Sequence, residues 1–431
     1  MRTEPYRVHC ADVSDLLPTL EAESFDAVLC DPPYGLSFMG KQWDHGVPSA
    51  EVWSEVLRVL KPGGHLIAFG GTRTFHRLTC AIEDAGFEIR DCLAWLYGQG
   101  FPKSLDISKA LDKAAGAERE VIGPSAVHSR GATTAFPKRP GERDVTESGR
   151  VTEQTAERAV LTAPATDAAR QWQGYGTALK PAWEPAILAM KPTVGTFAEN
   201  ALAHGVAGIN VDGCRIGTDG ATKRSDQAPY PRNADGKEDR SGSWARTGHA
   251  VEPLPLGRWP ANVALDEEAA AMLDEQSGEV GGGRFTNGGA SRFFYVSKAS
   301  RREREAGLEG LPRNGRRVVM ASSGRTMIDG EWVETHSEPI PRTNHHPTVK
   351  PIRLAEWLAR LLLPPKRDMP RRLLVPFSGS GSEMIGALLA GWDEVVGIER
   401  EAEYVEIAEA RLAHWAKDAE PQADLFAERT A

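Results

Sequence analysis

The chain has 431 residues, of which 41% are hydrophobic, so it is long enough to bury a full core and to carry a second module. Its formal net charge of −9 at pH 7 argues against nucleic-acid binding by the whole surface, although it leaves room for a local basic face.

The first residues lack a basic start followed by an apolar stretch, so we expect no secretory signal. No apolar run approaches the roughly 20 residues needed to cross a bilayer, so we expect no membrane partner. The five cysteines show no CxxC spacing, so neither a metal site nor a disulfide framework is indicated. These features predict a reduced, cytoplasmic protein.

Residues 1–115 alternate short apolar runs with helical patterns and form the first predicted region. Buried strands are expected within 6–12, 25–34, 65–71 and 91–98, and helices within 12–20, 49–64 and 72–87. Such alternation predicts a parallel sheet that is covered by helices on both faces.

Residues 116–345 have a different composition. The segments 129–160 and 217–248 are polar and poor in large apolar residues, so we expect loops or disorder there. Islands with aromatic anchors lie between and after them, at 171–192, 257–265 and 291–300. We therefore expect an irregular insert that serves recognition. Within it, residues 284–317 are locally basic, which fits either a contact with a phosphate backbone or a solvated helix of mixed charge.

Residues 346–415 return to regular structure, and residues 416–431 are expected to be a flexible tail. A helix is expected over 352–365, followed by a strand, a glycine turn, a helix and a strand over 371–401, and a closing helix over 403–415. We predict an α/β fold with one doubly wound, mostly parallel sheet, assembled from both ends of the chain around the insert.

The glycine turn at residues 376–383, PFSGSGSE, follows a strand and opens a helix. Gly379 and Gly381 permit backbone angles closed to other residues and let a ligand approach the main chain. The next strand ends on Glu399, where a carboxylate about 20 residues beyond a glycine turn suits the hydroxyls of a ribose. Because no phosphate-binding loop is present, a nucleoside without phosphates is the expected ligand, and an ordinary tight turn is the alternative.

The tetrapeptide Asp31-Pro32-Pro33-Tyr34 follows the apolar run AVLC, so it lies where a parallel sheet places its ligand crevice. The prolines stiffen the backbone and thereby fix the Asp31 carboxylate and the Pro32 carbonyl. Two neighbouring acceptors suit a planar amino group, and Tyr34 adds a flat face for a base.

Together, DPPY followed by FSGSG resembles the S-adenosylmethionine-dependent DNA amino-methyltransferases, which modify adenine N6 or cytosine N4. The order of the motifs is similar to that of the β-class, in which target recognition lies between the two halves. His346-Pro347-Thr348-Val349-Lys350-Pro351 matches the HPTxKP segment of that class. Smaller pieces, among them LAWLYGQGFPKS and GRWPANV, resemble a phage and bacterial branch.

The resemblance implies a Rossmann-like methyltransferase fold, S-adenosylmethionine as cofactor and double-stranded DNA as partner. It assigns the flipped base to the DPPY residues and the methionine part of the cofactor to the glycine turn. The ribose falls to Glu399, the adenine side of the cofactor to Asp12, and the carboxylate end of its methionine to His346 and Lys350. The residues so assigned are Asp31, Pro32, Pro33 and Tyr34 for catalysis, and Asp12, His346, Lys350, Phe377, Gly379, Gly381 and Glu399 for the cofactor.

Several alternatives stay open at this stage. Asp12 also fits a helix N-cap, and His346 also fits simple packing. DPPY favours adenine N6 as the target, with cytosine N4 as the alternative. The family turn usually reads DPFxGSGTT, whereas this chain has Val375 in place of the Asp and Ser382-Glu383 in place of the threonines, so an inactive DNA-binding relative is a further alternative. The resemblance also allows a homodimer and a cognate restriction enzyme, which the sequence does not locate.

Overall fold

The structure is a computed structural model of the chain. The described residues are 4–36, 46–98, 100, 104–124, 160–217, 257–278, 289–297, 301–311, 324–328, 331–335, 343–346 and 348–417. The chain divides into two compact units. The first comprises residues 1–99, 182–312 and 343–431, and the second residues 100–181 and 313–342.

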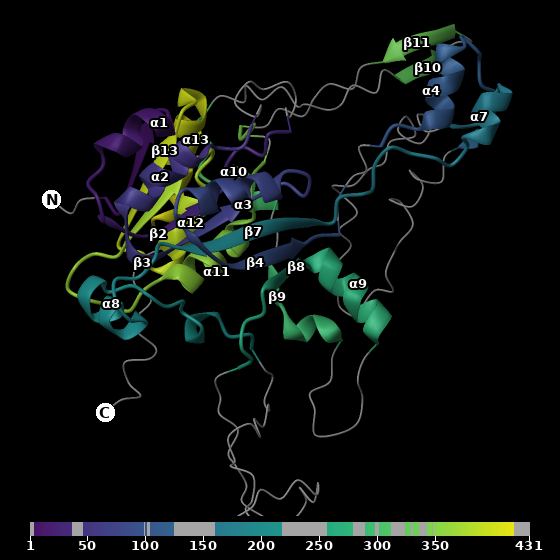
Figure 1. The fold of residues 1–431 in the computed structure, drawn as a ribbon. Coiled ribbons are helices and arrows are strands. Elements are labelled where there is room, and N and C mark those ends of the chain that lie inside the picture. The colour runs from purple at the N-terminus through teal and green to yellow at the C-terminus, as the bar shows by residue number, and fades with distance from the viewer. Residues whose placement is uncertain are drawn as a thin grey trace, which may run out of the picture. The chain divides into compact units, whose positions relative to one another are not determined.

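Within the described residues, the first unit is built on a nine-stranded sheet (Figure 1). All neighbouring strands pair in parallel except at β7, which is antiparallel to both of its neighbours. The prediction of one mostly parallel sheet assembled from both ends of the chain is therefore confirmed. The order across the sheet is β1 (Tyr6–Cys10), β13 (Glu394–Glu399), β12 (Arg372–Pro376), β2 (Phe25–Cys30), β3 (Leu60–Phe69), β7 (Trp183–Met190), β4 (Glu88–Leu96), β8 (Val263–Asp266) and β9 (Tyr295–Ser297).

The sheet also takes three strands from residues 116–345, which the sequence analysis assigned to an irregular insert. The strands β7, β8 and β9 lie in the three aromatic islands. Pro185–Met190 of β7 are all buried, because this strand runs between β3 and β4 in the middle of the sheet. The predicted boundaries at 116 and 345 thus differ from the boundaries of the two compact units. Whether the range reads a DNA target stays a prediction.

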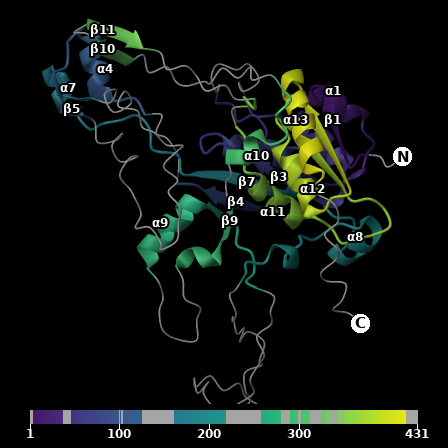
Figure 2. The same ribbon diagram turned by 180° about the vertical axis from the view of Figure 1, so that it is seen from behind.

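Helices cover both faces of the sheet, as a doubly wound fold requires. Alternation along β2 shows this directly: Ala27 and Leu29 belong to one core cluster, whereas Val28 and Cys30 belong to the other. The first cluster includes α11 (Ile352–Leu362), α12 (Ser382–Ala390) and α13 (Ala402–Trp415), which lie beside one another in Figure 2. The second includes α1 (Val13–Leu16), α2 (Ala50–Val59) and α3 (Phe75–Asp84).

Shorter elements of the first unit lie between the strands. They are α8 (Phe197–His204), α9 (Glu267–Ser277), α10 (Arg301–Glu305) and the 3-10 helices Leu17–Thr19, Asp212–Cys214 and Ala290–Phe293. A capping box begins α8, since the Thr196 hydroxyl accepts the Glu199 N–H and the Glu199 carboxylate accepts the Thr196 N–H. Among the residues that the structure describes, no helix has both the length and the apolar character that a bilayer span requires.

The second unit has its own small framework of α4 (Ile107–Ala114), α7 (Asp167–Gln171), β5 (Val121–Pro124), β6 (Val160–Thr162), β10 (Gly324–Ile328) and β11 (Glu331–Thr335). The buried Asp112 carboxylate joins α4 to the start of α7, because it accepts hydrogen bonds from Arg119, Ala165 and Thr166. Nearly all of the polar segments 129–160 and 217–248, and residues 418–431 of the tail, lie outside the described residues.

A buried carboxylate holds the amino ends of the central strands together. Asp26 of β2, whose side chain is fully buried, pairs with Lys61 of β3 at 2.7 Å and with Arg367 at 2.5 Å. It also accepts the backbone N–H of Arg372, the first residue of β12, at 2.7 Å. This one side chain therefore links β2, β3 and β12 at the end of the sheet opposite to the DPPY loop.

We expect Asp26→Ala to lower the free energy of unfolding by about 3–5 kcal/mol, because it leaves two partly buried cations, Lys61 and Arg367, without their buried carboxylate. Urea unfolding followed by tryptophan fluorescence measures this loss. The control is Glu55→Ala, which removes a half-exposed ion pair with Arg58 and should cost less than about 1 kcal/mol. Equal losses in the two variants would contradict the structural role of Asp26.

Candidate active site

The two sequence motifs lie at the ends of neighbouring strands. β2 and β12 pair in parallel, with Ala27 opposite Leu373 and Val28 opposite Leu374. Their carboxyl ends therefore reach the same edge of the sheet, where Asp31 follows β2 and Phe377 follows β12. The structure thus brings the DPPY loop and the glycine turn side by side, as one shared crevice requires.

The Asp31 carboxylate is held by two partners. The Tyr34 hydroxyl donates to Oδ1 at 2.7 Å, and the Lys350 ammonium donates to Oδ2 at 2.7 Å. Lys350 Nζ also donates to the Tyr34 hydroxyl oxygen at 3.0 Å and lies 4.8 Å from the centre of the Phe69 ring. Lys350 was predicted to reach the methionine carboxylate of a cofactor, and this stays a prediction; in the structure its ammonium contacts the DPPY residues.

A second carboxylate, Glu184 on β7, completes this group. Its Oε2 lies 3.1 Å from Lys350 Nζ and 3.2 Å from the Tyr34 hydroxyl. Because β7 runs antiparallel to β3, its amino end reaches the edge at which the parallel strands finish. Glu184 was not among the residues predicted from the sequence. A charged residue just before the buried run PAILAM was the available signal, and it gave no indication of the strand's direction.

Burial and charge decide the protonation of this group. Burial raises the pKa of Asp31, the Lys350 charge lowers it, and the Glu184 charge raises it again, with a net increase. Burial alone would lower the pKa of Lys350, but the charges of Asp31 and Glu184 outweigh it and raise that pKa. Burial also raises the pKa of the Tyr34 hydroxyl well above its usual range. Lys350 is therefore a cation and Tyr34 a neutral donor at neutral pH.

Glu383, in the first turn of α12, brings a third carboxylate toward the group. Its side chain is 4% exposed, and burial followed by the Asp31 charge raises its pKa. The charges of Lys350 and Arg411 act in the opposite direction. Val375 is fully buried in the core below the turn. The chain thus lacks a carboxylate at the end of β12 but places one at the start of the following helix.

The glycine turn has the backbone geometry expected of a ligand cradle. Phe377, Gly379 and Gly381 have φ values of +61°, +51° and +79°, which favour glycine and are strained at Phe377. The Gly379 N–H donates to Glu399 Oε2 at 2.8 Å. A Cβ atom built on Gly379 would lie 2.8 Å from His346 Nε2, so a larger residue would clash with the His346 ring.

The two acidic residues assigned to the cofactor's nucleoside lie on adjacent strand ends, since Cys10 of β1 pairs with Glu399 of β13. Asp12 accepts the Ser14 N–H at 2.9 Å and is the N-cap of α1, the alternative that the sequence left open. Glu399 Oε1 accepts the Glu401 N–H at 2.8 Å. A carboxylate has about four lone-pair positions, so Glu399 keeps acceptor capacity for hydroxyls.

His346 packs against the turn from the segment that precedes α11. Its ring lies 4.6 Å from the Tyr404 ring, and burial lowers the pKa of His346 to about 3, so the ring is neutral. Arg304 of α10 holds this segment through the Asn344 and His346 carbonyls. Part of the predicted basic stretch therefore supports the site. The cations of this stretch at 284, 298, 313, 316 and 317 lie outside the described residues.

The remaining predicted residues lie in the DPPY loop, where Pro32 is buried and Pro33 is half-buried. Pro347 of the HPTVKP segment and the loop residues Trp43 and Asp44 lie outside the described residues.

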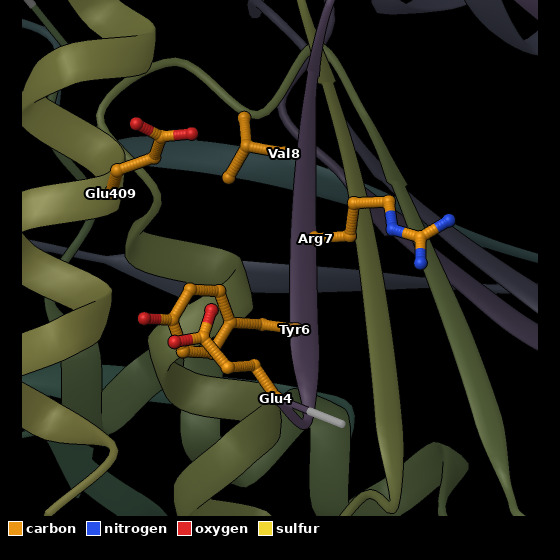
Figure 3. A pocket seen from close by; sticks show the side chains of 5 residues that line it. All are labelled: Glu4, Tyr6, Arg7, Val8 and Glu409. Carbon is orange, nitrogen blue, oxygen red and sulfur yellow. The ribbon is translucent and has the colours of Figure 1, made fainter. Parts of the chain in front are cut away.

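A separate open pocket lies at the free edge of the sheet (Figure 3). It has a volume of about 300 Å³ and is lined by residues of β1, its approach and α13: Glu4, Tyr6, Arg7, Val8 and Glu409. None of these residues was assigned a role in the site. The group of Asp31, Tyr34, Lys350 and Glu184 lies elsewhere, at the carboxyl ends of the parallel strands.

We expect Lys350→Met to lower the free energy of unfolding by about 3–5 kcal/mol at neutral pH, because Asp31 and Glu184 lose their shared cation. The folded-state pKa of Asp31 should rise further in this variant. The loss should therefore be smallest below the ordinary pKa of aspartate, near 3.9, and grow as the pH rises through the raised value. Urea unfolding at several pH values measures it. The double variant with Asp31→Asn should recover part of the loss, and strictly additive losses would contradict the ion pair.

Comparisons with known proteins place part of the chain near DNA methylases. Residues 25–114 match the family model described as DNA methylase. The type II methyltransferase M.HpaI of Haemophilus parainfluenzae is 31% identical over 119 residues, which cover 25% of this chain and 36% of that relative. The chain thus spans about a third of the length of this curated relative.

Two solved structures are similar over most of their length. The crystal structure of M1.HpyAVI is 11% identical, with 94% of this chain and 98% of that chain covered and a TM-score of 0.37. The PvuII DNA methyltransferase, described as cytosine-N4-specific, is 12% identical, with 95% and 86% covered and a TM-score of 0.40. Because both TM-scores are below 0.5, nothing about function is taken from them. What the comparisons show is that residues 25–114, which contain the DPPY loop, are similar to DNA methylases.

Proposed function

We propose that this protein is an S-adenosylmethionine-dependent DNA methyltransferase that modifies an exocyclic amino group. The observation that carries the proposal is the buried Asp31, fixed by Lys350 and Tyr34 at the sheet edge beside the glycine turn. The match of residues 25–114 to DNA methylases supports it independently.

The geometry supports S-adenosylmethionine as the methyl donor. Gly379 and Gly381 have the left-handed backbone conformation that the tight turn requires, and Glu399 keeps acceptor capacity for the two ribose hydroxyls. Asp12 lies beside Glu399 for the nucleoside, while Phe377 and the neutral His346 border the turn for the methionine part. When bound, S-adenosylmethionine supplies an electrophilic methyl group.

The chain's own residues would then activate the amine. An exocyclic amine is a weak nucleophile because its lone pair is delocalised into the ring. Hydrogen bonds to the Asp31 carboxylate and the Pro32 carbonyl would draw the nitrogen toward tetrahedral geometry, and Tyr34 would stack on the base. The nitrogen would bond to the methyl carbon as the bond between that carbon and the donor sulfur breaks, which leaves a neutral thioether, and the amine proton would pass to water. Positioning and electrostatics supply most of the rate, so no covalent enzyme intermediate is needed.

Double-stranded DNA is the proposed substrate, and its target base must leave the helix at a cost of a few kcal/mol to reach Asp31. Adenine N6 is the proposed target because the motif begins with Asp. Cytosine N4 is the second candidate, since it offers the same pair of N–H donors to Asp31 and Pro32. Val375 alone favours an inactive relative, and the intact Asp31 group argues against that alternative.

The test is methyl transfer from labelled S-adenosylmethionine to unmethylated genomic DNA, followed by mass spectrometry of the nucleosides. N6-methyladenine is the expected product, and N4-methylcytosine would assign the second candidate. We expect Asp31→Asn to lower the rate at least about 100-fold, since a fixed acceptor is lost, without changing the affinity for S-adenosylmethionine. The exposed Asp15→Asn is the matched control and should keep its activity. Absence of product and of cofactor binding in the folded wild type would refute the proposal.

We expect Glu399→Gln to weaken S-adenosylmethionine binding by about 1–3 kcal/mol, because a charged hydrogen bond to the ribose is lost. Calorimetric titration measures the dissociation constant. Glu401→Gln, two residues further on, is the control with unchanged affinity. An unaltered constant in the Glu399 variant would remove the ribose assignment while leaving the roles of Asp31 and Tyr34 intact.

A further inference from the structure

The Tyr34 hydroxyl lies between two carboxylates. Asp31 Oδ1 is 2.7 Å from the hydroxyl oxygen, and Glu184 Oε2 is 3.2 Å from it. A hydroxyl has one hydrogen, so it can donate to one of these acceptors at a time. The shorter distance indicates that Tyr34 donates to Asp31 in this arrangement. Glu184 is a second acceptor, to which the hydroxyl can donate if it turns away from Asp31.

Lys350 is shared in the same way. Its ammonium lies 2.7 Å from Asp31 Oδ2 and 3.1 Å from Glu184 Oε2, and its side chain is only 5% exposed. The three side chains therefore carry one positive and two negative charges when both carboxylates are ionised. The resulting net negative charge is what a site needs if positive charge develops on an amine nitrogen beside Asp31.

We propose that Glu184 is a positioning residue that keeps Asp31 available to the substrate amine, by accepting the Tyr34 hydroxyl and sharing the Lys350 ammonium. This inference rests on the proposed function. Without Glu184, both donors would have Asp31 as their shared carboxylate, and an incoming amine would have to compete with them. With Glu184, each donor has a second partner, so the Oδ1 lone pairs of Asp31 are released without leaving a buried donor unsatisfied.

The position of Glu184 in the sheet supports this role. It pairs with Trp95 of β4, and Ala186, two residues on, pairs with Phe69 of β3. The side chain thus comes from the middle of the sheet and not from a loop, with 23% of it exposed. A fixed strand can hold a carboxylate within hydrogen-bond reach of Tyr34 more rigidly than a loop can.

The pH dependence of Asp31 offers a direct readout. The charged and titratable groups that face Asp31 are Lys350 before α11, Glu184 on β7, Glu383 on α12, and Cys30 and Tyr34 on its own segment. The Glu184 charge raises the pKa of Asp31, so its removal should lower that pKa. A purely structural defect would scale activity at every pH without moving the acid limb.

The experiment compares wild type, Glu184→Gln, Glu184→Asp and the control Glu394→Gln. Glu394 pairs with Arg372 at the opposite end of the strands. Methylation rates at saturating S-adenosylmethionine are measured against pH, and the Asp31 pKa is measured directly from the side-chain signals of ¹³C-labelled aspartate. Glu184→Gln should lower kcat roughly 10- to 100-fold and shift both the acid limb and the Asp31 signal to lower pH.

Glu184→Asp keeps the charge and should keep the limb at its wild-type position while lowering kcat, since the shorter side chain withdraws from Tyr34. This variant serves if Glu184→Gln does not fold. The control should match wild type in both readouts. An unmoved Asp31 signal, or an unchanged kcat in the folded Glu184→Gln protein, overturns the role of Glu184 alone. A wild type that binds no S-adenosylmethionine and methylates no DNA overturns the proposed function as well.

Discussion

The ion pair between Asp31 and Lys350 is the interaction on which the site depends, and it joins residues 319 positions apart in the chain. Both side chains are almost fully buried, at 10% and 5% exposed. Charges withdrawn from water are costly unless they are paired and hydrogen-bonded, so neither group could stay in place alone. The pair therefore fastens the DPPY loop to the segment that leads into α11, and with it the first part of the chain to the last.

The sheet makes this pairing geometrically possible. Strands β2 and β12 are neighbours and parallel, so the two loops that follow them meet at one edge. Because β7 is antiparallel, its amino end lies beside the carboxyl ends of its parallel neighbours. A parallel strand could place only its carboxyl end there. Glu184 occupies that start and brings a carboxylate within reach of Lys350 and Tyr34. The one reversed strand among the described members of the sheet is thus also the one that completes the charge balance.

Charge at the site is arranged locally and bears little relation to the net charge of −9. Arg304, part of a stretch that looked suited to a phosphate backbone, holds the carbonyl groups of the segment around His346. Arg411 bonds to the Ser380 and Ser382 hydroxyls below the glycine turn. Glu383, at a position where the resemblance would place a threonine, is buried, and the Asp31 charge helps to raise its pKa. Charged side chains thus support the glycine turn and the segment beside it, while β12 carries Val375 and no aspartate before the turn.

The sequence by itself determined the fold class, the regular elements at both ends and the nearness of the DPPY loop and the glycine turn. Periodicity and glycine spacing are local properties, and the carboxyl ends of parallel strands must meet. The tertiary structure alone decided the partners of Lys350 and the membership of β7, β8 and β9 in the sheet. It also decided where the Glu184 carboxylate lies. Strand order and direction arise from pairing between distant segments. A short apolar run indicates a buried strand but does not tell whether that strand is parallel or antiparallel to its neighbours. The sequence could therefore name the acceptor Asp31 but not the second carboxylate that balances it.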